Sequence, residues 1–229
     1  MITIVQMHTE NYDSWAYLVL ENTKKYATKH GYKTYHRKIS YPKDRHPSWY
    51  RIPCILEAFN EPSTDWVFWS DIDSLIMQHS IKLEDFLIED KSLILNCQGE
   101  GMLCGKKIAE CLNMGQFFIK KSDWSISLLN AIWKWPDEYG KEEYLWKCWW
   151  ENDAFNYFWK NDILDFQKNS YVYESNRCFN SFYELGDWNP DSHYKQGDFI
   201  VHFSSQSEKK RESLVKKMIK DVQHSTNDT

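Results

Sequence analysis

Long apolar runs are absent from this sequence, since no stretch approaches the roughly 20 residues that a helix needs to cross a bilayer. The N-terminal residues, MITIVQMHTENYD, also lack the basic segment and the longer apolar segment of a secretory signal peptide. We therefore predict a cytoplasmic protein without a signal peptide, a membrane anchor or a transmembrane segment.

Cysteine pairs at metal-binding spacing are absent as well. No two cysteines form a C-x-x-C arrangement, so neither a zinc site of that kind nor a dense disulfide framework is indicated. We expect free thiols in a reducing compartment for all six cysteines, which are Cys54, Cys97, Cys104, Cys111, Cys148 and Cys178.

An excess of positive charge is also lacking. The formal net charge is -5 and the pI is near 5.9, whereas nucleic-acid-binding proteins usually carry a basic surface that displaces counterions from phosphates. A nucleic-acid partner is therefore not expected. Aromatic residues, by contrast, make up 17% of the chain, with 12 Trp and 14 Tyr. They are enough to fill a core and also to stack on flat ligand faces such as sugars or bases.

The chain length of 229 residues suits one α/β domain with a covered core and is short for two domains. Apolar runs predict strands at 1–6, 66–70, 92–96, 116–120 and 199–203, and a further strand is expected at 32–36, after the first helix. Residue patterns predict helices at 13–29, 49–59, 123–135, 149–159 and 207–223, with irregular segments at 40–49 and 167–196. Gly31 is expected to end the first helix and Pro136 the third. This order is typical of an α/β fold with a mostly parallel central sheet flanked by helices.

The segment WVFWSDIDSLI (66–76) predicts a buried strand that ends in two acids, Asp71 and Asp73. Ligands of open α/β sheets bind beyond the carboxyl ends of the strands, where this pair would lie. If the chain stays extended there, both carboxylates point the same way while Ile72 packs away from them. Two carboxylates at this spacing suit Mg²⁺ or Mn²⁺ next to a diphosphate, although an Asp-rich turn has the same sequence pattern.

Two enzyme classes use such an acidic pair. In a haloacid-dehalogenase-like Mg²⁺-dependent phosphatase the first Asp attacks phosphate, and a later Gly-Asp-x-x-x-Asp element holds the metal, a role that GDWNPD (186–191) could fill. However, Leu75 stands where that class has a hydroxyl, and the pair follows two α/β units instead of opening the domain. In a GT-A glycosyltransferase the acids hold a divalent cation against the diphosphate of a nucleotide-sugar donor. A non-catalytic carbohydrate-binding domain is a third alternative.

Six blocks extend the pattern over most of the chain: NTKKYATKHGY (22–32), PSWYRIP (47–53), WVFWSDIDSLI (66–76), LNMGQFFI (112–119), WENDA (150–154) and GDFIVHF (197–203). Together, in this order, they resemble glycosyltransferase family 34, which contains fungal galactosyl- and mannosyltransferases and plant xyloglucan xylosyltransferases. The resemblance implies a single GT-A (Rossmann-like) catalytic domain. Its nucleotide-binding half would be 1–112, its acceptor and catalytic half 113–206, and a basic C-terminal helix and tail 207–229.

The resemblance also implies a reaction and a cofactor. A hexose or pentose would move from a UDP- or GDP-linked nucleotide-sugar donor to a glycan or glycoconjugate acceptor, with retention of the anomeric configuration. The cofactor would be Mn²⁺ or Mg²⁺, and its protein ligands would be Asp71, Asp73 and His202, the last as a neutral imidazole.

Donor contacts are implied at several positions. Arg51 matches a family lysine near the donor phosphates, and a guanidinium can grip phosphate with two hydrogen bonds. At Gly115 the small residue would let the backbone approach the donor sugar. The family's late phosphate-binding lysine is missing after His202, so Lys209 or Lys210 would replace it. The full expected set of donor contacts is His8, Thr9, Tyr12, Arg51, Ser70, Asp71, Asn113, Gly115 and Lys209.

The triplet Glu151, Asn152 and Asp153 matches the family element near the anomeric carbon, which makes these three the expected catalytic residues. The amide oxygen of Asn152 would stabilise positive charge there, although the family commonly has the longer Gln. A front-face displacement and a double displacement with a covalent intermediate are both open. The polar face of a Trp-rich helix would produce the same triplet.

Overall fold

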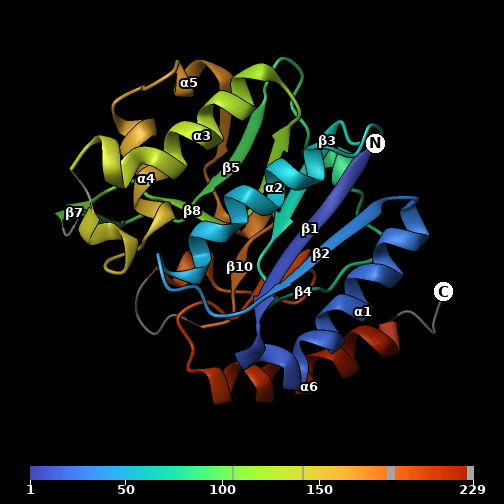
Figure 1. Ribbon diagram of the computed structural model, residues 1–229. Helices are drawn as coiled ribbons and strands as arrows, with labels where there is room; N and C mark the ends of the chain where they lie inside the picture. The colour runs from blue at the N-terminus through green and yellow to red at the C-terminus, as the bar shows by residue number, and fades with distance from the viewer. Residues whose placement is uncertain (105, 141, 185–188, 226–229) are drawn as a thin grey trace.

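The computed structural model describes residues 1–104, 106–140, 142–184 and 189–225, and is built on a six-stranded sheet (Figure 1). In spatial order its strands are β2 (Lys33–Ile39), β1 (Ile2–Thr9), β3 (Trp66–Ser70), β8 (Leu112–Lys120), β5 (Leu93–Cys97) and β9 (Ser170–Tyr173). Among these six strands, β8 alone runs antiparallel to its neighbours. The prediction of an α/β fold with a mostly parallel sheet is confirmed.

One face of this sheet is covered by α2 (Arg51–Phe59), α3 (Asp123–Glu138) and α4 (Glu151–Lys160). Because side chains alternate along a strand, Val67 and Trp69 of β3 point into this layer while Phe68 points to the other face. The layer is apolar and wholly buried at its centre, where Trp49, Trp135 and Phe155 pack. It forms the larger part of the core.

The other face carries α1 (Asp13–His30) and a small second sheet of β10 (Ser181–Phe182), β11 (Ile200–His202) and β4 (Ser74–Ile76). The C-terminal helix α6 (Glu208–Ser225) packs beside α1 and over β4, as Figure 1 shows at the lower right. The chain therefore leaves the main sheet after β3 and enters the second sheet at β4, with only Asp71 to Asp73 between them.

Short elements complete the described structure. A hairpin of β6 (Gly101–Leu103) and β7 (Lys106–Ile108) lies near α4. The others are the 3₁₀ turns Glu10–Tyr12, Pro47–Tyr50, Leu83–Phe86, Glu142–Leu145, Asn176–Cys178 and Pro190–Ser192, and α5 (Phe166–Asn169).

Several predicted elements match the structure closely. β3 has the predicted bounds, and α1 ends as expected at Gly31, whose φ of 75° is left-handed and whose N–H bonds to Ala27. The prediction that Pro136 ends the third helix was wrong, because α3 continues to Glu138. A proline this near the C-terminus removes only one hydrogen bond of the last turns. The segment predicted to be irregular, 167–196, contains β9, which pairs with β5 at the sheet edge.

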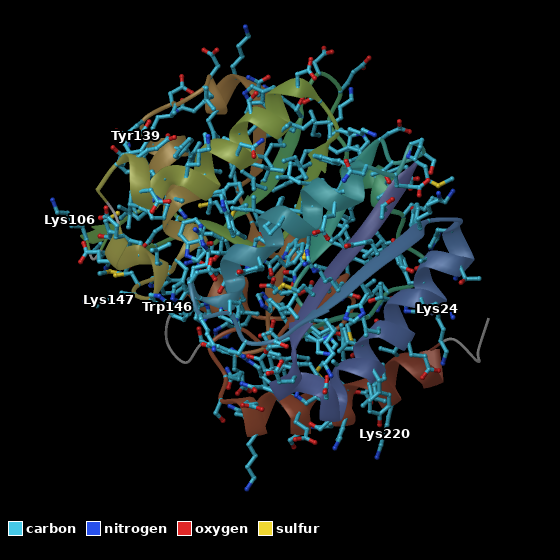
Figure 2. All side chains as sticks on the ribbon, viewed as in Figure 1. Lys24, Lys106, Tyr139, Trp146, Lys147 and Lys220 are labelled. Carbon is cyan, nitrogen blue, oxygen red and sulfur yellow. The ribbon has the colours of Figure 1, made fainter. Side chains whose placement is uncertain are left out.

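Charged side chains lie on the outer helices, where Figure 2 labels Lys24 on α1 and Lys220 on α6. On α6 the residues Leu214, Val215 and Met218 are buried against α1, which gives this helix one apolar face and one lysine-rich face. Among the described helices, none joins the length of a bilayer span to an apolar composition.

Candidate active site

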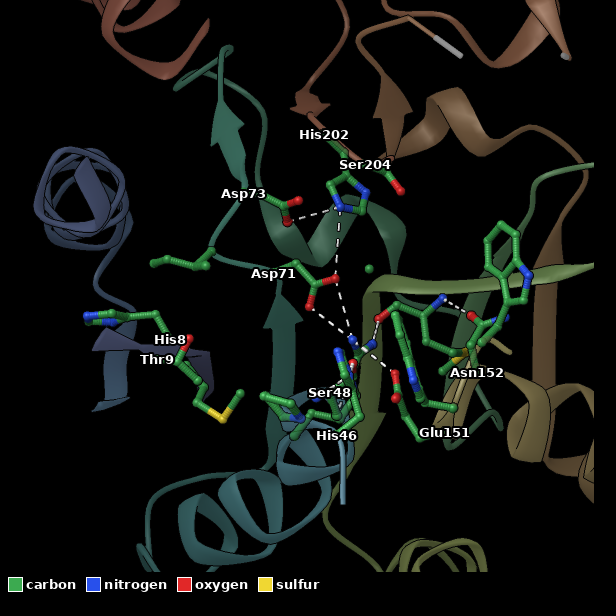
Figure 3. Close-up of a pocket in the computed structure, with 18 of the residues that line it drawn as sticks. His8, Thr9, His46, Ser48, Asp71, Asp73, Glu151, Asn152, His202 and Ser204 are labelled. Atoms are coloured by element: carbon green, nitrogen blue, oxygen red, sulfur yellow. Dashed lines mark hydrogen bonds and ion pairs between the residues drawn. The ribbon is translucent and has the colours of Figure 1, made fainter. Parts of the chain in front are cut away.

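A cleft of about 540 Å³ opens where β1 and β3 end. Figure 3 shows Asp71, Asp73 and His202 pointing toward one another, with Glu151 and Asn152 on one side of them and His8 and Thr9 on the other. Most residues predicted for the site line this cleft: His8, Thr9, Tyr12, Arg51, Asp71, Asp73, Asn113, Gly115, Glu151, Asn152 and His202.

The two aspartates meet through a turn. The strand ends at Ser70, and the hydroxyl of Ser74 donates to the carbonyl of Asp71 at 2.6 Å, which closes a turn over the intervening residues. The prediction that an extended chain aligns the two carboxylates was wrong in this respect, although Ile72 does pack into the core as expected. Their side chains are 22% and 13% exposed, so both carboxylates are accessible from the cleft.

His202 reaches the aspartates through the second sheet. In the antiparallel pair of β4 and β11 it lies opposite Ser74, and the next residue donates its N–H to the carbonyl of Asp73 at 2.8 Å. Its Nε2 is 3.2 Å from Oδ1 of Asp73 and 3.9 Å from Oδ2 of Asp71. One ligand atom from each of the three side chains lies within 4.8 Å of the others. Because adjacent ligands of an octahedral Mg²⁺ at about 2.1 Å are about 3 Å apart, these donors fit a divalent cation after small adjustments.

Two arginines flank the aspartates. Arg51, buried on α2, lies 3.2 Å from Asp71 and 3.0 Å from Glu151 through the same Nη2 atom, and also donates to the carbonyls of Ser48 and Met114. Arg211 lies 3.1 Å from Asp73 through Nε. Each aspartate therefore has its own cationic neighbour.

The protonation equilibria of the three acids differ. Burial raises the pKa of Asp71, helped by repulsion from Asp73 and opposed by Arg51. Burial acts in the same direction on Asp73, but attraction to His202, with Arg211 adding to it, outweighs burial and lowers the pKa of Asp73. Burial raises the pKa of Glu151 to about 7, although Arg51 opposes the shift. The cleft therefore holds one strongly acidic carboxyl beside two that are harder to ionise.

Glu151 begins α4 and is 2% exposed. Its Oε1 pairs with Arg51, whereas Oε2 has no hydrogen-bond partner among the described residues. The start of a helix favours negative charge, because unpaired backbone N–H groups gather there. This oxygen is thus a buried acceptor at the edge of the cleft.

The other two members of the predicted triplet are engaged elsewhere. Asn152 accepts from the N–H of Met114 at 2.9 Å and donates to the carbonyl of Leu112 at 3.2 Å, so its amide holds α4 to β8. Asp153 is wholly buried and does not line the cleft, which corrects the prediction that it lies beside the anomeric carbon. Burial raises the pKa of Asp153 to about 6.

His8 uses both ring nitrogens within the protein. Nε2 is 3.0 Å from the carboxylate of Asp13, and Nδ1 is 2.8 Å from Nε2 of His36. Burial lowers the pKa of His36 to about 4, with repulsion from His8 adding to the shift. Both ring nitrogens of His8 therefore lie within hydrogen-bonding distance of other side chains of the protein.

Gly115 has a role that the sequence did not indicate. A Cβ atom there would lie 2.4 Å from Cε1 of His202, so the missing side chain makes room for the imidazole. Its neighbour in the motif, Asn113, lines the cleft, but the side-chain oxygen accepts from the N–H of Gly115 and the nitrogen donates to Gln98. Ser70 is buried beneath the cleft, with its hydroxyl 3.0 Å from that of Ser74.

The C-terminal segment brings Arg211 to the cleft, where Lys209 or Lys210 was expected. Lys209 is exposed and does not line the cleft, which corrects the prediction that it contacts the donor. Arg211 precedes Leu214 and Val215 by three and four residues, so helical periodicity could have identified it as the inward-facing cation of α6. The element GDWNPD (186–191) proposed for a phosphatase lies partly outside the described residues.

Aromatic side chains form the wall of the cleft beyond Glu151. The rings of His46 and Trp150 stack with centroids 3.6 Å apart and planes 2° apart. Trp150 has a φ of 52°, an unusual value for a residue with a side chain, and such strain is often found at functional sites. Trp149 also lines the cleft, and so does Tyr41, whose N–H lies 3.4 Å from the carboxylate of Glu10. The sequence showed many aromatic residues but could not indicate that these four line one cleft.

Solved structures of two glycosyltransferases are similar to this fold. One, a glycosyltransferase involved in the glycosylation of the major capsid of PBCV-1, has a TM-score of 0.72 and 18% identity, and the similarity covers 94% of this chain and 98% of that one. The other, galactosyltransferase LgtC in complex with donor and acceptor sugar analogs, has a TM-score of 0.59 and 12% identity over 94% of this chain and 95% of that one. The predicted GT-A type of fold is confirmed.

Curated relatives are similar in sequence. An uncharacterized alpha-1,2-galactosyltransferase of Schizosaccharomyces pombe is 27% identical over 216 residues, or 80% of this chain and 61% of that protein. The probable alpha-1,6-mannosyltransferase MNN10 of Saccharomyces cerevisiae is 26% identical over 227 residues, or 85% of this chain and 57% of that protein. The chain thus spans about 60% of the length of these relatives. The model of the galactosyl transferase GMA12/MNN10 family matches residues 1–99 and 96–212, and the chain belongs to this family.

Proposed function

We propose that the protein is a metal-dependent retaining glycosyltransferase that moves a sugar from a nucleotide-sugar donor to a glycan acceptor. The observation that carries the proposal is the convergence of Asp71, Asp73 and His202 within 4.8 Å in the cleft. Two carboxylates and an imidazole suit Mn²⁺ or Mg²⁺, and a bound ion of this kind would neutralise the diphosphate and help the nucleotide to leave.

The charges around the cleft support a metal-bound diphosphate. When Asp71, Asp73 and Glu151 are ionised, they exceed the two arginines, Arg51 and Arg211, by one negative charge. An anionic donor would then meet a negative site. Adding one divalent cation makes the same set positive by one charge, so the donor would bind only together with the metal.

We propose that Arg51 and Glu151 act on the reacting end of the donor. The guanidinium of Arg51 contacts both Asp71 and Glu151 and can therefore link the metal side to the sugar side of the cleft. The unpartnered Oε2 of Glu151 can accept a sugar hydroxyl or stabilise positive charge at the anomeric carbon. Asn152 and Asp153 would hold the start of α4 in place. The front-face and covalent routes both use a carboxylate at this position, so the choice between them stays open.

The acceptor would bind against the aromatic wall. His46, Trp149 and Trp150 line the cleft beside Glu151, Tyr41 lines it as well, and aromatic faces pack well on the apolar faces of sugars. The relatives are named as galactosyl- and mannosyltransferases, which favours a UDP- or GDP-linked hexose as the donor. All three predicted segments (1–112, 113–206 and 207–229) would contribute, since Asp71, His202 and Arg211 come from different ones.

Metal-dependent nucleotide binding tests this function. The melting temperature is measured with UDP and with GDP, each with and without Mn²⁺, for the wild type and for Asp71→Asn. We expect one nucleotide to raise the melting temperature only when Mn²⁺ is present, and we expect the variant to lose this rise. A melting temperature that neither nucleotide changes with Mn²⁺ would contradict the proposal. Turnover of a generic aryl phosphate without any nucleotide sugar would instead indicate the phosphatase.

A further inference from the structure

His202 has two ring nitrogens, and only one of them faces the aspartates. Nε2 is 3.2 Å from Asp73, whereas Nδ1 is 2.9 Å from Oδ1 of Asn180 on the opposite side of the ring. A neutral imidazole carries one proton, so a metal can bind at Nε2 only if the proton is on Nδ1. The tautomer of His202 therefore decides whether the three-ligand site of the proposed function is ready for a metal.

A backbone N–H fixes the orientation of the amides behind His202. The N–H of Gly115 can only donate, and it points at a side-chain atom of Asn113 at 2.9 Å. That atom must therefore be the oxygen of Asn113, and its nitrogen then donates to Oε1 of Gln98 at 2.8 Å. The direction of this first amide follows from the main chain.

The next amide in the chain is Asn180, which is wholly buried. The same oxygen of Asn113 lies 2.9 Å from its side chain, so Asn180 must present its nitrogen there. Its oxygen is left to face Nδ1 of His202, and an oxygen without a hydrogen can only accept. Nδ1 must then carry the proton, and the lone pair of Nε2 points toward Asp71 and Asp73.

The position of Asn180 is itself secured. Its backbone N–H donates to the carbonyl of Asn176 at 2.9 Å, and its carbonyl accepts from the side-chain nitrogen of Asn176. The ring of His202 packs against Gly115, where a Cβ atom would lie 2.4 Å from Cε1. Turning the side chain of Asn180 would break its hydrogen bonds to both Asn113 and His202.

The opposite tautomer would be the natural choice without Asn180. Nε2–H could donate to the carboxylate of Asp73 at the 3.2 Å already present, and a hydrogen bond to a carboxylate is stronger than one to an amide oxygen. A proton at Nε2 would block the metal-binding lone pair. The carboxylates alone therefore favour the tautomer that cannot bind a metal.

We propose that Asn180 is a positioning residue that holds His202 in the Nδ1–H tautomer, with its direction set by the Gly115 N–H through Asn113. Asn180 does not line the cleft. Its effect on a metal would pass through the imidazole, as partners of metal-bound histidines commonly act.

The tautomer can be measured without metal or donor. Two-dimensional ¹H–¹⁵N correlation spectra of the ¹⁵N-labelled protein, recorded at alkaline pH, distinguish the two neutral tautomers by the shifts of the ring nitrogens. Signals of His202 are identified by their loss in His202→Gln. We expect Nδ1 to carry the proton in the metal-free wild type. An Nε2–H tautomer there would overturn the inference, even if the protein proves to be a metal-dependent transferase.

Asn180→Leu keeps the approximate volume of the side chain and removes the acceptor. We expect this variant to change to the Nε2–H tautomer and to bind Mn²⁺ about 10- to 100-fold more weakly by calorimetry. Asn180→Asp keeps an acceptor for Nδ1–H but loses the amide that donates to Asn113, so it should retain the wild-type tautomer with a weaker contact to Asn113. It provides a second test if the leucine variant does not fold.

The matched control is Asn96→Leu. Asn96 is equally buried and lies opposite Asn113 in the β5–β8 pair, but neither of its amide atoms has a hydrogen-bond partner among the described residues. We expect it to leave both the tautomer and the Mn²⁺ affinity unchanged. An Asn180→Leu protein that keeps the Nδ1–H tautomer, or an Asn96→Leu protein that loses it, would contradict the role of Asn180.

Discussion

On the aspartate side of the cleft, each carboxylate already has charged neighbours, whereas on the Glu151 side one buried carboxylate oxygen has no partner among the described residues. Asp73 lies between His202 and Arg211, and its pKa is lowered, while burial raises the pKa of Glu151 to about 7. The first arrangement stabilises charge before any ligand arrives. In the second arrangement, a ligand would donate the hydrogen bond that Oε2 of Glu151 lacks.

Arg51 joins these two sides, since one of its nitrogens contacts both Asp71 and Glu151. We propose that the aspartate side of the cleft binds the cation and that the Glu151 side binds the sugar. Substitutions that affect one side and spare the other can test it.

The largest effect is expected from Arg51→Met. This change leaves Asp71 and Glu151 without their shared cation, and removing one partner of a buried ion pair costs about 3–5 kcal/mol of unfolding free energy. Urea denaturation measures the loss. Arg45→Met is the control, because Arg45 is also buried but pairs only with the exposed Asp44 among the described acids, and should cost much less. Equal losses would show that the two ion pairs of Arg51 add no more to stability than the contacts of another buried arginine.

The next effect is expected from Asp73→Asn. An amide keeps the shape but loses the charge that faces His202 and Arg211, so we expect nucleotide-sugar turnover to fall on the order of 100- to 1,000-fold. Hydrolysis of the nucleotide sugar measures the loss of turnover, and Mn²⁺ titration measures the loss of metal affinity that we expect with it. Asp198→Asn removes a carboxylate that pairs with Arg177 away from the cleft, and activity should survive there.

Glu151→Gln should separate binding from chemistry. We expect turnover to fall about 100-fold while Mn²⁺-dependent nucleotide binding stays near the wild-type value, because the metal ligands are untouched. Steady-state kinetics and calorimetry on the same samples measure both. If nucleotide affinity fell as far as turnover did, Glu151 would also contribute to nucleotide binding, and the two sides of the cleft would not have separate roles.

Gly115→Ala is expected to act on the aspartate side alone. Its Cβ atom would lie 2.4 Å from the His202 ring, so the ring or the backbone at residue 115 must shift and the position of the imidazole beside Asp73 is disturbed. We expect Mn²⁺ to bind about 10-fold more weakly, with little change in the urea midpoint. An unchanged Mn²⁺ affinity would remove the imidazole from the ligand set or show that the ring has room to shift.

The smallest effect concerns pH and Asp153. Burial raises the pKa of Asp153 from 3.8 to about 6, so the folded state holds its proton more tightly than the unfolded state. The stability from this proton is complete below pH 3.8 and is lost as pH rises to about 6. The melting temperature of Asp153→Asn, relative to that of the wild type, should therefore rise by a few degrees as the pH goes from 3.8 to about 6, while turnover changes little. A constant difference would contradict the shift.

Local sequence was enough for the parts of the fold that depend on neighbouring residues. β3 and α1 were predicted closely, because an apolar run and a left-handed Gly31 are local signals. The strand at residues 170–173 was not predicted, because β9 owes its conformation to pairing with β5, which is distant in the chain. The end of α3 was predicted wrongly at Pro136, because packing holds the last turn of the helix against the preference of this one residue.

The sequence by itself determined which residue types the site would use: a pair of aspartates after a buried strand, a glutamate at the start of a helix and a late histidine. Only the tertiary structure decided how they meet. The register of β4 against β11 brings His202 to Asp73, and the face of α6 that packs on α1 selects Arg211 over Lys209. These contacts join residues more than a hundred positions apart, and the local patterns we used report on neighbours in the chain only.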